Sequence, residues 1–232
     1  MADYATIYRE YADQYERLVT YEDYELNLPR ALEQIRSFNQ ADVIELGAGT
    51  GRVTLLYAAH ARSIIAGDRE SSMLKFAYTK LAALHRSHWR TVIADNRRLP
   101  LPDQIADISI AGWSIGHMQH WYPDTWRSEI DQIIHQMRRV LRPTGTIIII
   151  ETLGTGSTEP SPPHERLAAY YQMLEQDYGF ASTAIRTDYK FDSVQQASEV
   201  LGFFFGDEFA AWIIDRQSPI VPECTGLWWR TK

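Results

Sequence analysis

The feature that most constrains this chain is a glycine-rich turn between an apolar segment and a helical one. The stretch reads Val43-Ile44-Glu45-Leu46-Gly47-Ala48-Gly49-Thr50-Gly51. The apolar pattern of residues 42–46 predicts a buried strand, and residues 52–60 predict a helix. Glycine adopts backbone angles that other residues avoid, and it lets a ligand approach the chain closely. The pattern therefore predicts a tight strand-to-helix turn whose free N–H groups face whatever lies above it.

Asp68 gives this turn a more specific meaning. It follows the apolar run 63–67 and lies twenty-one positions beyond Gly47. A carboxylate at the C-terminal end of a strand can accept hydrogen bonds from both hydroxyls of a ribose. Dinucleotide binding also asks for a third glycine, in the pattern G-x-G-x-x-G, where this chain has Arg52. The two observations together favour a nucleoside cofactor over a dinucleotide.

Strand and helix patterns alternate through the rest of the chain. Strands are expected at 63–67, 91–94, 107–111 and 145–151, and helices at 72–85 and 126–141. After a loop rich in Gly, Ser, Thr and Pro at 154–163, we expect a helix at 164–178, a strand at 182–191, a helix at 194–202 and a strand at 225–230. Such alternation predicts an α/β fold with a parallel sheet covered by helices on both faces.

The turn, with Glu45 before it and Asp68 beyond it, resembles the first motif of class I S-adenosylmethionine (SAM) dependent methyltransferases. The segments 68–74, 95–103 and 142–145 also resemble family motifs, and the tyrosine-rich run 8–18 is similar to the start of ubiquinone/menaquinone-biosynthesis methyltransferases. The resemblance implies a Rossmann-like sheet of seven strands in the order 3-2-1-4-5-7-6, with strand 7 antiparallel. It also implies a single domain over 1–232: an N-terminal helical cap (1–40), a cofactor-binding core (41–152), and a variable segment with a terminal antiparallel hairpin (153–232).

The resemblance assigns SAM as the cofactor and S-adenosylhomocysteine as its product. Residues that it places at the cofactor are Tyr15, Glu45, Gly47, Ala48, Gly49, Asp68, Arg69, Met73, Asp95, Asn96 and Trp113. Gly47 to Gly49 would line the methionyl part, and Asp68 would hold the ribose. Arg69 and Met73 would flank the adenine, while Asp95 and the backbone of Asn96 would meet its edge. Tyr15 would close over the cofactor, and an aromatic ring such as Trp113 can stabilise a sulfonium by a cation–π contact.

Two histidines in the segment after the fourth core strand are candidates for catalysis. His117 and His120 lie in the run 112–121, at the carboxyl end of the strand, where substrate and cofactor meet in this kind of sheet. Imidazole titrates near neutral pH, so either ring is a candidate general base for a hydroxyl, amine or acidic carbon. Neither ring is obligatory, because methyl transfer mainly requires alignment of the two reactants and exclusion of water.

Composition and charge exclude several classes of binding partner. A net charge of −7 argues against a dedicated nucleic-acid surface. No apolar run approaches the length of a membrane span, and the polar N-terminus does not resemble a signal peptide, so we expect a cytoplasmic protein. The single Cys224 rules out an internal disulfide, and no His/Cys spacing suggests a metal site. We therefore expect a small-molecule methyl acceptor, with no nucleic acid, membrane or metal.

Three other functions compete with small-molecule methyl transfer. Aminopropyl transfer on the same fold would need a further Asp in the glycine loop, where Thr50 stands. A non-catalytic protein that binds SAM or S-adenosylhomocysteine would keep the same motifs over a closed acceptor cleft. A protein-directed methyltransferase is the remaining alternative.

Overall fold

The structure is a computed structural model that describes residues 4–232. Its helices are α1 (Tyr4–Glu10), α2 (Ala12–Val19), α3 (Asn27–Ile35), α4 (Arg52–Tyr57), α5 (Ser71–Ala82), α6 (Met118–Trp121), α7 (Trp126–Val140), α8 (Glu165–Gln172), the π-helical turn η1 (Met173–Asp177), α9 (Val194–Phe205) and α10 (Asp207–Arg216). Its strands are β1 (Asp42–Leu46), β2 (Ser63–Asp68), β3 (Trp89–Ile93), β4 (Ala106–Gly112), β5 (Leu141–Thr155), β6 (Ala181–Arg186), β7 (Tyr189–Lys190), β8 (Ile220–Val221) and β9 (Glu223–Thr231).

The main sheet confirms the predicted topology. Its seven strands follow the order β3-β2-β1-β4-β5-β9-β6. Strands β1 to β5 pair in parallel, whereas β9 runs antiparallel to both β5 and β6. With β9 counted as the seventh strand, this is the predicted order 3-2-1-4-5-7-6. The terminal strand thus enters between β5 and β6, as the resemblance implied.

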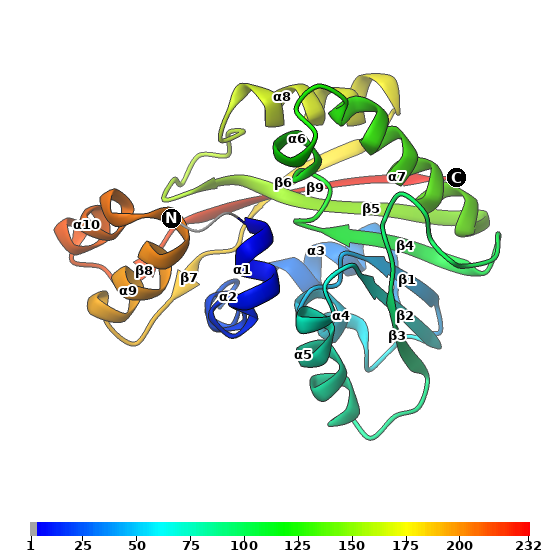
Figure 1. Ribbon diagram of the computed structural model, residues 1–232, viewed down its shortest axis with the longest axis horizontal. Coiled ribbons are helices and arrows are strands. Elements are labelled where there is room, and N and C mark those ends of the chain that lie inside the picture. The colour runs from blue at the N-terminus through cyan, green and yellow to red at the C-terminus, as the bar shows by residue number, and fades with distance from the viewer. Residues whose placement is uncertain (1–3) are drawn as a thin grey trace.

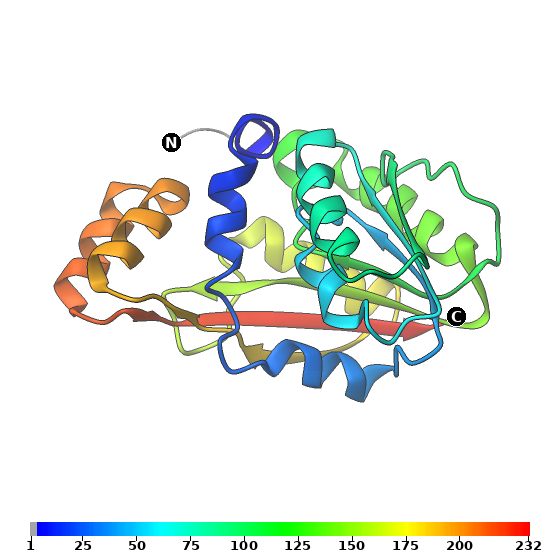
Figure 2. The same ribbon diagram turned by 90° about the horizontal axis from the view of Figure 1, so that it is seen from below.

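The isoleucine run in β5 shows why this sheet is buried on both faces. Ile147 and Ile149 pack in a cluster with α7 and α8, and Ile148 and Ile150 pack in a second cluster with α3 and α4. Successive side chains of a strand point to opposite faces, so a continuous apolar run needs cover on each side. Figure 1 shows α6, α7 and α8 on one side of the sheet, and Figure 2 shows α3 on the other.

Three segments differ in detail from the sequence patterns. The N-terminal cap begins with two helices rather than one, because the helical path breaks at Tyr11, which has non-helical backbone angles. The strand expected at 182–191 is two strands: β6 belongs to the main sheet, and β7 pairs with β8 in a separate two-stranded sheet. The strand expected at 145–151 begins earlier, since Leu141 already pairs with Ala106.

The extra sheet and the helices α9 and α10 form a lobe beside one end of β5 and β9 (Figure 1). Both views place α1 and α2 between this lobe and α5. Ion pairs hold them on each side: Arg17 contacts Glu199 of α9 at 2.6 Å, and Glu16 contacts Lys80 of α5 at 2.7 Å. The N-terminal helices therefore bridge two parts of the chain that are far apart in sequence. No helix within 4–232 is long and apolar enough to cross a membrane.

The glycine turn has the conformation that its sequence predicts. Gly47, Gly49 and Gly51 all have positive φ, at 66°, 55° and 83°. A Cβ on Gly47 would lie 2.4 Å from the Cβ of Ser114, which follows β4, so the two segments touch with no space for a side chain. Gly47 is therefore required both for its backbone angle and for close packing.

Glu45 lies under the turn and holds α4 against β1. Its carboxylate accepts hydrogen bonds from the hydroxyls of Thr54 and Tyr57, and only 2% of the residue is exposed. Burial raises the pKa of Glu45 from its ordinary 4.5 to about 7. A carboxyl in this position therefore favours its protonated form more strongly in the folded than in the unfolded protein.

We expect Gly47→Ala to lower the free energy of unfolding by about 2 kcal/mol or more, because it adds both a backbone strain and a steric clash. Urea unfolding would measure the change. Gly179→Ala is the matched control: it has the same φ of 66°, but its nearest neighbour, a nitrogen of Arg230, is 3.9 Å from the added Cβ. Equal losses for the two variants would contradict the clash with Ser114.

Glu45→Gln should change how stability depends on pH. Because the folded pKa of Glu45 lies above the unfolded one, its stabilising contribution is complete below pH 4.5 and is lost as the pH rises through about 7. The glutamine cannot ionise, so the variant should gain stability over the wild type between pH 5 and 8, by an amount on the order of 2–3 kcal/mol. Urea unfolding at several pH values would test this, and a pH-independent difference would refute it.

Candidate functional site

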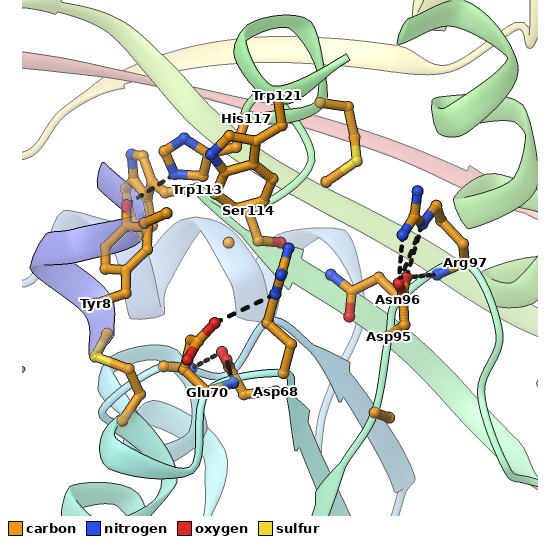
Figure 3. A pocket seen from close by; sticks show the side chains of 18 of the residues that line it. Tyr8, Asp68, Glu70, Asp95, Asn96, Arg97, Trp113, Ser114, His117 and Trp121 are labelled. Carbon is orange, nitrogen blue, oxygen red and sulfur yellow. Dashed lines mark hydrogen bonds and ion pairs between the residues drawn. The ribbon is translucent and has the colours of Figure 1, made fainter. Parts of the chain in front are cut away.

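A cavity opens at the carboxyl ends of β1, β2, β3 and β4, over the glycine turn. It is lined by Ala5, Tyr8, Tyr15, Gly47, Gly49, Asp68, Arg69, Glu70, Met73, Ala94, Asp95, Asn96, Arg97, Gly112, Trp113, Ser114, His117, Met118 and Trp121. We call it the cofactor cavity. Figure 3 shows Tyr8, Trp113, His117 and Trp121 on one side of it, Asp68 and Glu70 on another, and the segment 95–97 on a third. Nine of the eleven residues predicted at the cofactor line it.

Asp68 has the geometry that ribose binding needs. Its carboxylate accepts hydrogen bonds from the backbone N–H of Gly49 and of Glu70, both at 2.8 Å. One bond goes to each oxygen, and a carboxylate oxygen has capacity for a second. Asp68 can therefore hold the glycine turn and still accept hydrogen bonds from two ligand hydroxyls.

The Asp95 carboxylate already forms an ion pair within the protein, which the sequence did not indicate. The guanidinium of Arg97 donates to both of its oxygens, at 2.9 and 2.6 Å, and also contacts Glu129 at 2.9 Å. The Arg97 ion pair lowers the pKa of Asp95, so the carboxylate is ionised at neutral pH. Arg97 is thus a local tie between β3 and α7, and an adenine amino group at Asp95 would share the carboxylate with it.

The remaining predicted cofactor residues divide into two groups. Arg69, Met73 and Asn96 line the cavity, and the guanidinium of Arg69 lies 5.3 Å from the ring centre of Trp121. Glu45 and Ala48 are not among the lining residues. The position of Glu45 beneath the turn explains its place in the motif: it shapes the loop from below.

The N-terminal helices form the roof of the cavity. Tyr8 of α1 and Tyr15 of α2 line it, and their rings meet edge to face with centres 5.4 Å apart. The Tyr8 carbonyl accepts from the Ser72 hydroxyl at 2.8 Å, which fixes α1 to the start of α5. The break at Tyr11 lets both rings reach the cavity, whereas Tyr11 itself is 40% exposed.

A second, larger cavity of about 950 Å³ adjoins the first. It is lined by Tyr8, Tyr15, Leu18, Val19, Glu22, Arg52, Trp113, Gly116, His117, Gln119, His120, Glu151, Thr152, Thr155, Pro163, His164, Glu165, Arg166, Leu167, Tyr189, Phe204, Phe205, Phe209 and Glu223. We call it the acceptor cavity. Four residues line both cavities: Tyr8, Tyr15, Trp113 and His117. Its volume lies within the range of small-molecule sites.

His117 stands at this boundary. Its Nε2 is 2.8 Å from the Tyr8 hydroxyl, and the ring also hydrogen-bonds to the backbone of Trp113. The Trp113 N–H donates to Ile150, so its carbonyl is the group that accepts from the ring. Burial, aided by nearby His120, lowers the pKa of His117 to about 4, which leaves it uncharged at neutral pH.

His120 differs from His117. It is exposed and lines only the acceptor cavity. His164, which also lines this cavity, accepts a hydrogen bond from the backbone N–H of Leu167 and thereby caps α8. Within 4–232, no group of three or more His, Cys, Asp or Glu side chains is arranged to hold a metal ion.

Arg52, which the sequence offered only as an argument against dinucleotides, is a buried part of the acceptor cavity. Its guanidinium contacts Glu22 at 2.7 Å and stacks 3.8 Å from the ring centre of Trp113. One face of Trp113 is therefore already covered by a cation. Trp113 itself has a φ of 48°, an uncommon angle for a residue with a large side chain.

Two further buried carboxyls in the acceptor cavity were missed by the sequence analysis. Glu151, near the end of the isoleucine run, accepts from the backbone N–H of Gly116 at 2.9 Å. Glu223, at the start of β9, accepts from the Thr152 hydroxyl at 2.8 Å. Burial raises the pKa of Glu151 to about 7, and burial together with the charge of Glu22 raises that of Glu223. A charged residue next to a fully apolar strand was the available signal for Glu151.

Five other aromatic residues of the C-terminal segment do not line the acceptor cavity. Tyr170, Tyr171 and Trp228 pack in the hydrophobic core under α7 and α8, and neither Trp212 nor Trp229 lines a cavity described above. Part of the aromatic lining of the acceptor cavity comes from α9 and α10, through Phe204, Phe205 and Phe209.

Solved structures share this fold at low sequence identity. A SAM-dependent methyltransferase from Aquifex aeolicus is 14% identical, covers 87% of this chain and 88% of its own, and has a TM-score of 0.56. The YcgJ protein from Bacillus subtilis is 13% identical, covers 90% and 98%, and has a TM-score of 0.61. The [4+2]-cyclase SpnF is 20% identical, covers 87% and 80%, and has a TM-score of 0.55. These similarities establish the fold, which carries more than one reaction.

The sequence itself gives the more specific result. No curated protein matches the chain in sequence. Residues 44–149, however, match the family described as a methyltransferase domain. That stretch contains the glycine turn, Asp68, Asp95 and His117, and so most of the cofactor cavity. Residues 44–149 therefore match a methyltransferase domain, and the chain has the fold of solved SAM-dependent methyltransferases.

Proposed function

We propose that the enzyme transfers a methyl group from SAM to a small molecule bound in the acceptor cavity, by direct in-line displacement. The observation that carries the proposal is the shared boundary: Tyr8, Tyr15, Trp113 and His117 line both cavities. A donor on one side and an acceptor on the other would meet at this boundary. A volume of about 950 Å³ suits a small molecule rather than a folded macromolecule.

The proposed cofactor site uses the residues that line the first cavity. Bound SAM supplies an electrophilic methyl carbon. Asp68 would accept from the ribose hydroxyls, and Asp95 from the adenine amino group. Gly47 and Gly49 would let the methionyl part lie against the backbone. The space beside Gly49 is open, because a Cβ added there would meet no atom closer than 3.5 Å. Tyr15 would cover the cofactor from above.

We propose that the residues at the boundary mainly position the two reactants and do not transfer a proton. A buried histidine with a pKa of about 4 is a weak base at neutral pH. His117 instead holds the Tyr8 hydroxyl, which lies between the cavities and can orient the attacking atom. The α1 and α2 helices exclude water from the reacting atoms, and in-line displacement needs this alignment and exclusion above all.

Asp68→Asn tests the cofactor site. The variant loses the charge that would bind two ribose hydroxyls, and we expect the affinity for S-adenosylhomocysteine to fall roughly tenfold or more. Calorimetry would measure it. Asp124→Asn, an exposed aspartate in the turn before α7, is the matched control and should bind like the wild type. Unchanged affinity in Asp68→Asn would remove Asp68 from the site.

Thr155→Trp tests the separation of the two cavities. Thr155 lines only the acceptor cavity, so a large ring there should occupy acceptor space and leave the cofactor site intact. With methyl-labelled SAM and mixed small-molecule acceptors, we expect product formation to fall about tenfold or more while S-adenosylhomocysteine affinity stays within about twofold.

The same labelled SAM would be offered to peptide and RNA pools. Label in peptide or RNA, with none in small molecules, would overturn the proposed acceptor class. Firm cofactor binding with no transfer to any pool would favour a non-catalytic binding protein.

A further inference from the structure

The acceptor cavity contains a carboxylate oxygen that lacks a partner. Only 2% of Glu223 is exposed, and its Oε1 accepts from Thr152. Its Oε2 has no hydrogen-bond partner among residues 4–232. Burying an acceptor without a donor is costly, so native proteins satisfy nearly all such groups with protein, water or ligand. Glu223 therefore offers a site for a hydrogen-bond donor inside the cavity.

A second unpartnered acceptor lines the same cavity. Gln119 is 2% exposed, and its amide nitrogen donates to the carbonyl of Arg166. Its Oε1 has no partner within the described part of the chain. An amide oxygen and a carboxylate oxygen can only accept hydrogen bonds. Both oxygens can therefore accept from a ligand that donates at its polar end, and a buried donor of the cavity, Nη2 of Arg52, already lies 2.7 Å from a Glu22 oxygen.

The buried ionisable groups of the cavity indicate which charge the ligand should carry. Three buried carboxyls line the cavity, Glu22, Glu151 and Glu223, against one buried guanidinium, Arg52. Arg52 is already used, because it pairs with Glu22 and stacks on Trp113. An anion would add to the excess of acidic groups, whereas a cation would offset it.

The raised pKa values keep Glu151 and Glu223 partly protonated at neutral pH unless a cation lies beside them, so a cation is the ligand that would ionise them. Burial and the charge of Glu22 raise the pKa of Glu223, and burial raises that of Glu151 to about 7. A positive charge placed beside either carboxyl would favour its ionised form. The phenylalanines of α9 and α10 add apolar and π surface to the same cavity, which suits the body of an amine and can also contact its cation.

We propose that the methyl acceptor is a protonated amine with an apolar or aromatic body, and that Glu223 holds its ammonium group. The proposal rests on the function proposed above, since it names the class of molecule in that acceptor cavity. The ammonium serves as the recognition group, and the reacting atom lies at the boundary near Tyr8 and His117. An ammonium donates three hydrogen bonds, which matches the unpartnered oxygen of Glu223.

Calorimetry with two sets of probes tests the charge preference. Each set keeps one aromatic body and varies the polar end: tryptamine, tryptophol and indole-3-acetate, then 2-phenylethylamine, 2-phenylethanol and phenylacetate. With the enzyme saturated with S-adenosylhomocysteine, we expect at least one amine to bind about tenfold more tightly than its alcohol, and the acids to bind most weakly. Failure of both amines to bind at millimolar concentration, or a preference for the alcohols or acids, would overturn the proposal.

Glu223→Gln tests whether Glu223 causes the preference for amine over alcohol. The amide keeps the shape of the side chain and an oxygen for Thr152, but it removes the charge. We expect the preference for amine over alcohol to fall to about twofold or less. Glu208→Gln removes an exposed carboxyl of α10 that lines neither cavity, and it should keep the wild-type preference. An unchanged preference in Glu223→Gln would show that another group holds the ammonium.

The probe series with the wild-type enzyme tests the charge preference by itself. A folding defect in Glu223→Gln would therefore not affect that test. S-adenosylhomocysteine affinity is measured separately for each protein. Loss of cofactor binding with a retained amine preference would count against the proposed cofactor site alone. Normal cofactor binding without an amine preference would count against this proposal alone.

Discussion

The hydrogen bond from the Gly49 N–H to Asp68 connects the two halves of the cofactor cavity. It joins the turn after β1 to the end of β2, at 2.8 Å, in a conformation that only glycine adopts readily. Glu45 supports the same turn from below by holding α4. With the turn fixed from both sides, its backbone can face a ligand without rearrangement, which is the basis of preorganised binding.

The acceptor cavity is built on a different principle. The parallel core contributes residues at the carboxyl ends of its strands, among them Trp113 and Glu151, together with Arg52 at the start of α4. The other walls come from α2, from the segment before α8, and from the lobe of α9 and α10. The N-terminal helices join these parts, since ion pairs tie α2 to both α5 and α9. Within one methyltransferase fold, such added walls decide which molecule can reach the methyl donor.

Buried charge in this cavity is organised around Arg52. Its guanidinium neutralises Glu22 and covers one face of Trp113, so it cannot also balance Glu151 and Glu223. Trp113 is consequently held by a protein cation on one side, in a backbone conformation with positive φ. A cation–π contact of Trp113 with a sulfonium would have to use the opposite face. The residue is thus fixed in position before any ligand binds.

The sequence by itself determined the parallel core, because strand and helix periodicity and the glycine turn are local patterns. The order of the strands and the place of Asp95 came from the resemblance to class I SAM-dependent methyltransferases. The sequence also indicated Asp68, which ends a strand at the edge where the carboxyl ends of parallel strands meet. Only the tertiary structure decided the rest. The break at Tyr11 that turns Tyr8 and Tyr15 into the cavity depends on how α1 and α2 pack between α5 and α9. Glu22, Arg52, Glu151 and Glu223 are separated by long stretches of chain, and no sequence pattern places them in one cavity. Their shared burial is a property of packing between distant segments, which no local pattern records.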